Sequence, residues 1–102
     1  MEAKRMAFYV YILRCSDGSY YTGHTDNLEA RLTAHQSGSI KGYTYLRRPV
    51  QLVFAQDFPS RDEAFQRERQ VKGWSRGKKE ALIRQDWERL KELARVHGMA
   101  QA

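Results

Sequence analysis

The sequence predicts a small α+β fold, a three-stranded antiparallel sheet flanked by helices in the order β-β-α-β-α-α. Two observations lead to this expectation. Three stretches rich in aromatic and β-branched residues predict strands, and three amphipathic stretches interleaved with them predict helices. A chain of 102 residues suits one domain with one core. We therefore expect a single domain over 1–102, with its core at about 7–85 and its last helix reaching about 97.

The first two strands are expected to form a hairpin. Residues 8–14 and 20–25 are rich in tyrosine and β-branched side chains, and the segment between them centres on Asp17-Gly18, a favoured turn pair. A third strand is predicted at 50–58. Gly23 is unusual near the end of a strand, because glycine weakens a strand unless something must approach its backbone closely.

Capping residues predict where the first two helices begin. Asp26 and Ser60 are each followed three residues later by a glutamate, as in a capping box. Gly38 is expected to end the first helix. The second helix runs to about Lys72, before a basic break at 73–79.

A third helix is expected at 75–97, ended by Gly98. Its apolar residues fall at helical spacing and are Leu82, Ile83, Trp87, Leu90, Leu93 and Ala94. Such a face covers the sheet or forms a dimer contact, so we expect a monomer or a weak dimer.

Composition favours an acidic partner and excludes several classes of protein. The chain has 18 Lys and Arg against 12 Asp and Glu, a formal charge of +6 and a pI of about 9.7. This surplus favours DNA, RNA or an anionic membrane face, although a merely soluble basic protein fits it equally well. The lone Cys15 permits no disulfide within a monomer, and no Cys/His spacing indicates zinc. No apolar run is long enough to cross a bilayer, so we expect a cytoplasmic protein.

Three charged or titratable residues lie where helices should be apolar. Arg31 and His35, one turn apart, border the apolar side of the first helix, where an arginine can snorkel or serve a site. Glu68 falls inside the apolar stripe of the second helix. A carboxylate there must be paired, protonated or bound to a cation. A salt bridge to Arg31 and a metal-binding or acid–base role are both open.

Tyrosines on both arms of the hairpin form the third feature. Residues two apart in a strand share a face, which places Tyr9 with Tyr11, and Tyr21 with Gly23. Packing in the core explains Tyr9 and Tyr20 well. It explains Tyr11 and Tyr21 less well once an arginine, a histidine and a glutamate lie nearby.

These residues together resemble a known family. The order Tyr9-Val10-Tyr11, Tyr21-Thr22-Gly23, Arg31, His35 and Glu68 is similar to the GIY-YIG nuclease superfamily, and specifically to its small stand-alone bacterial members of the UPF0213 type. The tripeptides alone are weak signals, whereas the ordered set across roughly 7–85 is specific.

The resemblance implies cleavage of a phosphodiester bond with one Mg²⁺ or Mn²⁺ ion. Glu68 would bind the metal, which suits a hard cation that keeps most of its waters. Arg31 would brace the phosphate. Tyr11 is the candidate general base, with Tyr21 supporting it, and His35 would contact phosphate or relay a proton. A phenol is a poor base at its ordinary pKa of about 10, so a nearby cation must lower it or another base must replace it.

Further residues are expected to contact nucleic acid. The resemblance implies that Gly23 lets the strand approach the scissile phosphate. His24 replaces the lysine of repair-nuclease relatives, and it either contacts nucleic acid or lies on the other face of the sheet as a surface residue. The basic and aromatic residues of two segments complete the set: Lys41, Tyr43, Arg47, Arg48, Lys72, Trp74, Arg76, Lys78 and Lys79.

The expected function is a metal-dependent endonuclease acting on DNA rather than RNA. With no recognition helix or added domain, low sequence specificity is expected, and the exposed aromatic residues favour single-stranded or branched DNA. The alternative is a non-catalytic nucleic-acid-binding module on the same fold, which has no need of a buried Glu68. A protein-interaction domain using the last helix is a third reading, and a protein partner stays open.

Overall fold

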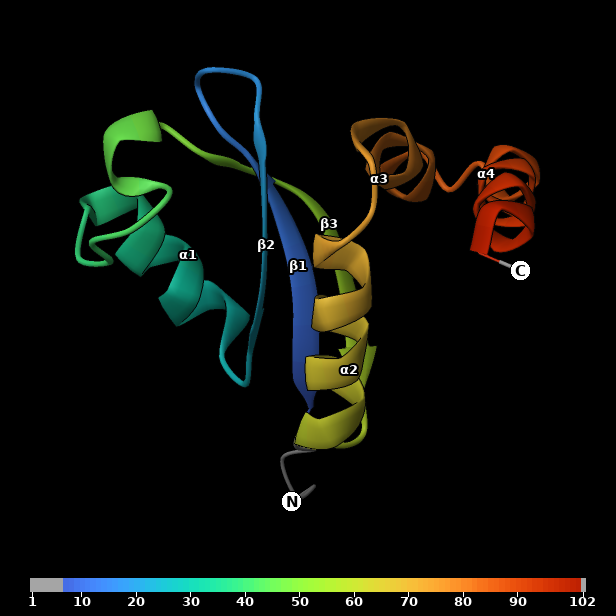
Figure 1. The fold of residues 1–102 in the computed structure, drawn as a ribbon. Coiled ribbons are helices and arrows are strands. Elements are labelled where there is room, and N and C mark those ends of the chain that lie inside the picture. The colour runs from blue at the N-terminus through green and yellow to red at the C-terminus, as the bar shows by residue number, and fades with distance from the viewer. Residues whose placement is uncertain (1–6, 102) are drawn as a thin grey trace. The chain divides into compact units, whose positions relative to one another are not determined.

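The computed structural model describes the backbone of residues 7–101 and the side chains of residues 7–94 (Figure 1). Its contacts divide the chain into two compact units, one ending at Lys72 and one beginning at Gly73. Each unit is described by itself. That they act as a single domain over 1–102 stays a prediction. No helix among the described residues is both long and apolar enough to span a bilayer.

The first unit is built on a three-stranded antiparallel sheet, as the sequence predicts. Its strands are β1 (Phe8–Arg14), β2 (Tyr20–Thr25) and β3 (Gln51–Phe58), in the spatial order β2-β1-β3. The central strand β1 is buried on both faces, which explains its near-continuous run of apolar residues. The turn after β1 is the expected one, with Gly18 at a φ of 84°.

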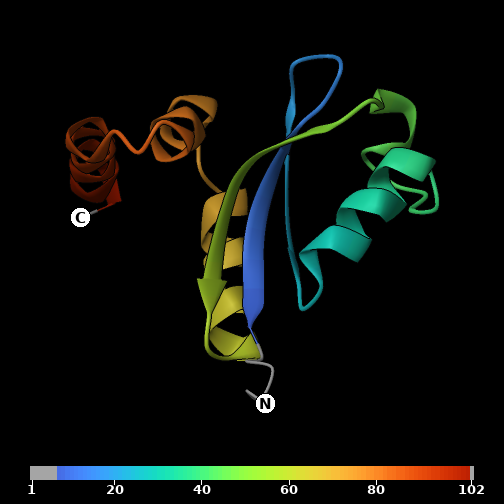
Figure 2. The same ribbon diagram turned by 180° about the vertical axis from the view of Figure 1, so that it is seen from behind.

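Two helices cover opposite faces of this sheet (Figures 1 and 2). Helix α1 (Leu28–Ser37) packs through Leu28 and Leu32 on a core that includes Tyr11 and Leu13. Helix α2 (Arg61–Lys72) packs against all three strands. Because alternate residues of a strand face opposite ways, β1 supplies Tyr11 to the α1 side.

The helix ends confirm most of the capping predictions and correct one. Asn27 rather than Asp26 caps α1, because its Oδ1 accepts a hydrogen bond from the backbone N–H of Ala30 at 3.1 Å. Asp26 instead forms an exposed ion pair at 3.5 Å with Arg61. Gly38 ends α1 at a φ of 81°. The Ser60 hydroxyl accepts from the Glu63 N–H at 3.2 Å and donates to its carboxylate at 2.8 Å. A short 3-10 helix, η1 (Tyr45–Arg47), lies between α1 and β3.

The second unit shows that the prediction of one helix over 75–97 is wrong. The structure has α3 (Arg76–Ile83) and α4 (Trp87–Gln101). The helical conformation is interrupted at Gln85, which has a left-handed backbone with a φ of 56°. Asp86 then starts α4 by accepting a hydrogen bond from the N–H of Arg89 at 3.1 Å. Helix α4 continues past Gly98, which was expected to end it.

Candidate active site

A buried chain of three polar side chains lies at the centre of the candidate site. The Tyr11 hydroxyl is 2.9 Å from Nε2 of His35, and Nδ1 of His35 is 2.8 Å from Oγ1 of Thr44. Each of the three residues is 1% exposed. Tyr11 comes from the middle of β1, His35 from the last turn of α1, and Thr44 from the loop before η1. The contacts satisfy both ring nitrogens of a histidine that has no access to water.

These contacts allow a proton to move in either direction. In one imidazole tautomer Tyr11 donates to His35, which donates to Thr44; in the other tautomer both hydrogen bonds reverse. Burial, followed by the charge of Arg31, lowers the pKa of His35. Burial is also the main cause that raises the pKa of Tyr11, so the phenol is protonated and the imidazole neutral near pH 7.

Gly23 has a structural role beneath the Tyr11 ring. The two residues are paired across β1 and β2. A Cβ atom at position 23 would lie 2.6 Å from the Tyr11 hydroxyl oxygen and 2.7 Å from Cζ. Both distances are shorter than any van der Waals contact. The glycine is therefore required by the Tyr11 side chain, and its expected approach to a phosphate stays a prediction.

Tyr21, which strand alternation places with Gly23, extends the cluster from β2. Its ring centroid is 6.3 Å from that of Tyr11 and 5.1 Å from that of His35. It also stacks on Tyr43, with 6.1 Å between ring centroids and 25° between the ring planes. The Tyr21 hydroxyl has no hydrogen bond within residues 7–94, which leaves it available to a substrate.

Arg31 and Glu68 both act on the Tyr11 hydroxyl through their charges. The positive charge of Arg31 lowers the pKa of Tyr11, and the negative charge of Glu68 raises it. Arg31 is exposed and forms no ion pair within residues 7–94. The salt bridge between Arg31 and Glu68, one of the two sequence-based explanations of the buried carboxylate, is therefore not what the structure shows.

The Glu68 carboxylate instead lies between nitrogen atoms of His24 and Lys72. Its Oε1 is 3.0 Å from Nδ1 of His24, and its Oε2 is 3.4 Å from Nζ of Lys72. The Glu68 side chain is 8% exposed, against 27% for His24 and 51% for Lys72. His24 lies on the face of β2 opposite Tyr21, but it contacts Glu68 and is no plain surface residue.

The donor set fits one hydrated divalent ion. No group of three or more His, Cys, Asp or Glu side chains is placed to share a metal among the described residues. Mg²⁺ and Mn²⁺ are often held by one or two carboxylates, several waters and substrate phosphates. The buried Glu68 matches this arrangement, and the exposed Lys72 has the freedom to leave its oxygen. Glu68 would hold the ion.

The basic residues expected to bind nucleic acid fall into two groups. In the first unit Arg47 pairs with Asp17 at 3.0 Å and lies 4.0 Å over the Tyr43 ring. Lys41 and Arg48 lie over Tyr45, at 4.0 and 5.0 Å. Trp74, Arg76, Lys78 and Lys79 belong to the second unit, where Lys78 lies 4.4 Å over the Trp74 ring. Tyr43 has Tyr21 and Arg47 against its ring, so a stacked base would have to displace one of them.

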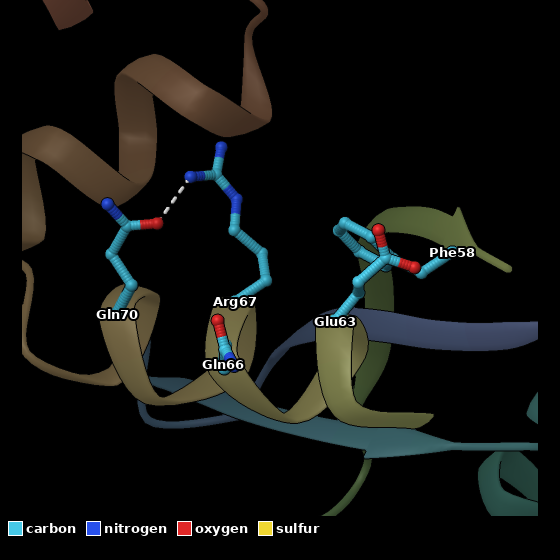
Figure 3. Close-up of a pocket in the computed structure, with 5 residues that line it drawn as sticks. All are labelled: Phe58, Glu63, Gln66, Arg67 and Gln70. Atoms are coloured by element: carbon cyan, nitrogen blue, oxygen red, sulfur yellow. Dashed lines mark hydrogen bonds between the residues drawn. The ribbon is translucent and has the colours of Figure 1, made fainter. Parts of the chain in front are cut away.

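A separate pocket lies on the first unit between the end of β3 and the outer side of α2 (Figure 3). Its lining residues are Phe58, Glu63, Gln66, Arg67 and Gln70. Arg67 donates a hydrogen bond of 2.6 Å to Gln70 across it. None of these five is a predicted site residue, so the candidate site rests on the convergence of side chains around Tyr11.

Sequence reasoning missed Thr44 and the pairing of Glu68 with His24. Thr44 is a small polar residue in a basic loop, and nothing in its neighbourhood marks it as buried. For His24 a signal was present, because strand alternation places it on the face opposite Tyr21. That helix α2 covers this face was not readable from the sequence.

Comparison with known proteins identifies the family and the fold. A model of the GIY-YIG catalytic domain matches residues 7–81. A UPF0213 protein of Staphylococcus saprophyticus is 47% identical over 75 residues, which are 74% of this chain and 92% of that protein. The solution structure of the UPF0213 protein BH0048 of Bacillus halodurans is 49% identical, with a TM-score of 0.51, over 76% of this chain and 83% of that one. Protein EF2693 of E. faecalis is 41% identical with a TM-score of 0.57, over 83% and 90%.

Proposed function

The chain belongs to the GIY-YIG catalytic domain family, a family of nucleases, and from this premise we propose that it is a divalent-metal-dependent endonuclease that hydrolyses phosphodiester bonds in DNA. One observation carries the proposal. The buried Tyr11 hydroxyl is hydrogen-bonded to His35 and lies within the electrostatic reach of both Arg31 and Glu68. A purely structural tyrosine needs one hydrogen-bond partner but neither of the two charges.

Tyr11 and His35 act as a couple in this proposal. Cleavage by water requires that a proton be removed from the attacking water. The phenol is protonated in the free protein, so it accepts that proton only as it passes its own to Nε2 of His35. The imidazole is available to receive it because burial and Arg31 lower the pKa of His35 and keep the ring neutral, and Nε2 is the accepting atom in the tautomer in which Nδ1 donates to Thr44.

Arg31 and Glu68 both serve to neutralise the charge of the phosphate, Arg31 directly and Glu68 through the metal ion. Arg31 is exposed and unpaired within the described side chains, which leaves its guanidinium free to bind phosphate oxygens in a bidentate fork. Glu68 would hold the metal ion, which would supply positive charge to offset the negative charge on the phosphate. Tyr21, whose ring lies beside those of Tyr11 and His35 and whose hydroxyl has no hydrogen bond within residues 7–94, orients the reacting groups.

The substrate we propose is DNA, cleaved with low sequence specificity and with a preference for single-stranded or branched forms. The net charge of +6 supplies attraction to phosphates independent of sequence. Tyr43, next to Tyr21, is 42% exposed, so it is reachable by an unpaired base once Arg47 moves aside.

The test is a cleavage assay beside a variant without the metal ligand. Labelled single-stranded, duplex and branched DNA and a matched RNA are incubated with Mn²⁺, Mg²⁺ or EDTA. We expect metal-dependent cutting that disappears in Glu68→Gln and persists in Glu29→Gln, which alters an exposed carboxylate on α1. DNA binding should survive in both variants, and thermal melting checks their folding. Binding without cutting on every substrate would instead favour the non-catalytic binding module.

A further inference from the structure

Two buried polar atoms on one face of β2 lack hydrogen-bond partners. Within residues 7–94, the buried side-chain atoms without a partner are Oγ1 of Thr22 and Nδ1 of His24. Residues two apart in a strand face the same way, so both atoms lie on the side of β2 that α2 covers. Buried polar groups are almost always satisfied, and each exception calls for an explanation such as an ion or a water.

The nearest polar atom to Nδ1 of His24 is a carboxylate oxygen at the right separation for a shared metal. Oε1 of Glu68 lies 3.0 Å away, yet the two atoms are not aligned as a hydrogen bond. Adjacent ligands of an octahedral ion with bonds of about 2.1 Å are separated by about 3.0 Å. The pair is therefore spaced as two neighbouring ligands, while its misalignment argues against an N–H pointing at the oxygen.

Both side chains come from regular elements that fix their positions. His24 is held by β2, and its ring packs edge-on against Phe65 at 5.6 Å between centroids. Glu68 lies one turn further along α2, on the same helix as Phe65. Ligands on a strand and a helix are held more precisely than ligands on loops. The His24 side chain is 27% exposed although its Nδ1 is buried, so the pair lies near the protein surface.

We propose that Nδ1 of His24 is a second protein ligand beside Glu68, and that this nitrogen–oxygen pair selects Mn²⁺ or another transition metal over Mg²⁺. The inference rests on the proposed function in taking Glu68 as the metal ligand. Imidazole nitrogen favours transition metals, whereas Mg²⁺ strongly prefers oxygen. The second ligand goes beyond the family resemblance. The resemblance implies one glutamate as the protein ligand of the metal, and its repair nucleases carry a lysine at the position of His24.

Pulsed electron paramagnetic resonance of bound Mn²⁺ tests the inference without relying on activity. Protein labelled with ¹⁵N at histidine is loaded with Mn²⁺, and electron spin echo envelope modulation detects a nitrogen bonded to the ion. We expect the nitrogen coupling in the wild type and in His97→Phe, and its loss in His24→Phe. Calorimetry should give Mn²⁺ binding at least about tenfold weaker in His24→Phe, because one of the two protein ligands is lost. A tenfold change corresponds to about 1.4 kcal/mol.

Two further variants separate the outcomes. His24→Asn keeps an oxygen near the position of Nδ1, so it should recover binding and shift preference toward Mg²⁺. Glu68→Gln should abolish binding altogether. Binding that depends on Glu68 but shows no histidine nitrogen overturns the inference and leaves the proposed function intact. Binding that is unchanged in Glu68→Gln contradicts the proposed function as well. The wild-type spectrum decides the point even where His24→Phe fails to fold.

Discussion

The Tyr11 hydroxyl lies 2.9 Å from Nε2 of His35, in a contact that joins the middle of the sheet to the end of α1. Both side chains are buried, so neither has water as an alternative partner. The contact therefore serves two purposes. It satisfies two polar groups of the core, and it connects the predicted base to a neutral imidazole.

Tyr11→Phe should separate these purposes. The variant removes the proton-accepting oxygen, so cleavage should slow by about 10²–10⁴-fold, the usual contribution of general acid–base catalysis. It also leaves Nε2 of His35 without a partner, which should lower the free energy of unfolding by about 1–3 kcal/mol. Single-turnover rates and urea unfolding measure the two effects. Tyr9→Phe is the matched control on the same strand, and wild-type rates in Tyr11→Phe across pH would refute the assignment.

Gly23→Ala should displace the Tyr11 ring. The new methyl group would lie 2.6 Å from the Tyr11 hydroxyl oxygen, which forces the side chain away from its position against His35. Overpacking of this kind costs about 1–3 kcal/mol of unfolding free energy. The control is Gly42→Ala, where a Cβ atom meets nothing within 4 Å. Equal stability and equal cleavage rates for the two alanine variants would contradict the structural role of Gly23.

The stability of the protein should fall in mild acid because of His35. Burial and Arg31 hold its folded-state pKa below the ordinary value of about 6.5. The unfolded chain then binds the proton more readily, so stability from the neutral ring is complete above about pH 6.5 and is lost as the pH falls toward the folded-state pKa. Urea unfolding of wild type and His35→Gln from pH 7.5 to 5 measures this. The difference between them should shrink with falling pH, whereas a constant difference would exclude it.

Local signals in the sequence predicted the sheet and most of the helix ends. The aromatic and β-branched runs gave β1 and β2 their observed bounds, and Gly38 ends α1 as expected. The division between α3 and α4 was missed because the apolar spacing continues through it. Asp86 is a capping residue and was the available clue, but the left-handed Gln85 was not predictable, since such a conformation is uncommon for residues other than glycine.

The candidate site was predicted wherever it depends on position within one element. Strand alternation placed Tyr21 with Gly23 on one face of their strand, and the strand pairing in the structure adds Tyr11 to that face. Contacts between elements were beyond such reasoning. The partner of Glu68 depends on how α2 crosses β2, and the sequence suggested Arg31 where the structure has His24 and Lys72.

Lys72→Met should strengthen metal binding. Nζ of Lys72 lies 3.4 Å from Oε2 of Glu68, so the ammonium group and a divalent cation compete for the same carboxylate. Because the lysine side chain is 51% exposed, the pair is worth about 0.2–1 kcal/mol, and its removal should raise Mn²⁺ affinity by roughly 1.4- to fivefold. Calorimetric titration of Lys72→Met beside Lys91→Met, which removes the same charge from an exposed position on α4, distinguishes competition at Glu68 from a change in net charge. Weaker binding in Lys72→Met alone would mean that the lysine positions the carboxylate for the metal instead of competing with it.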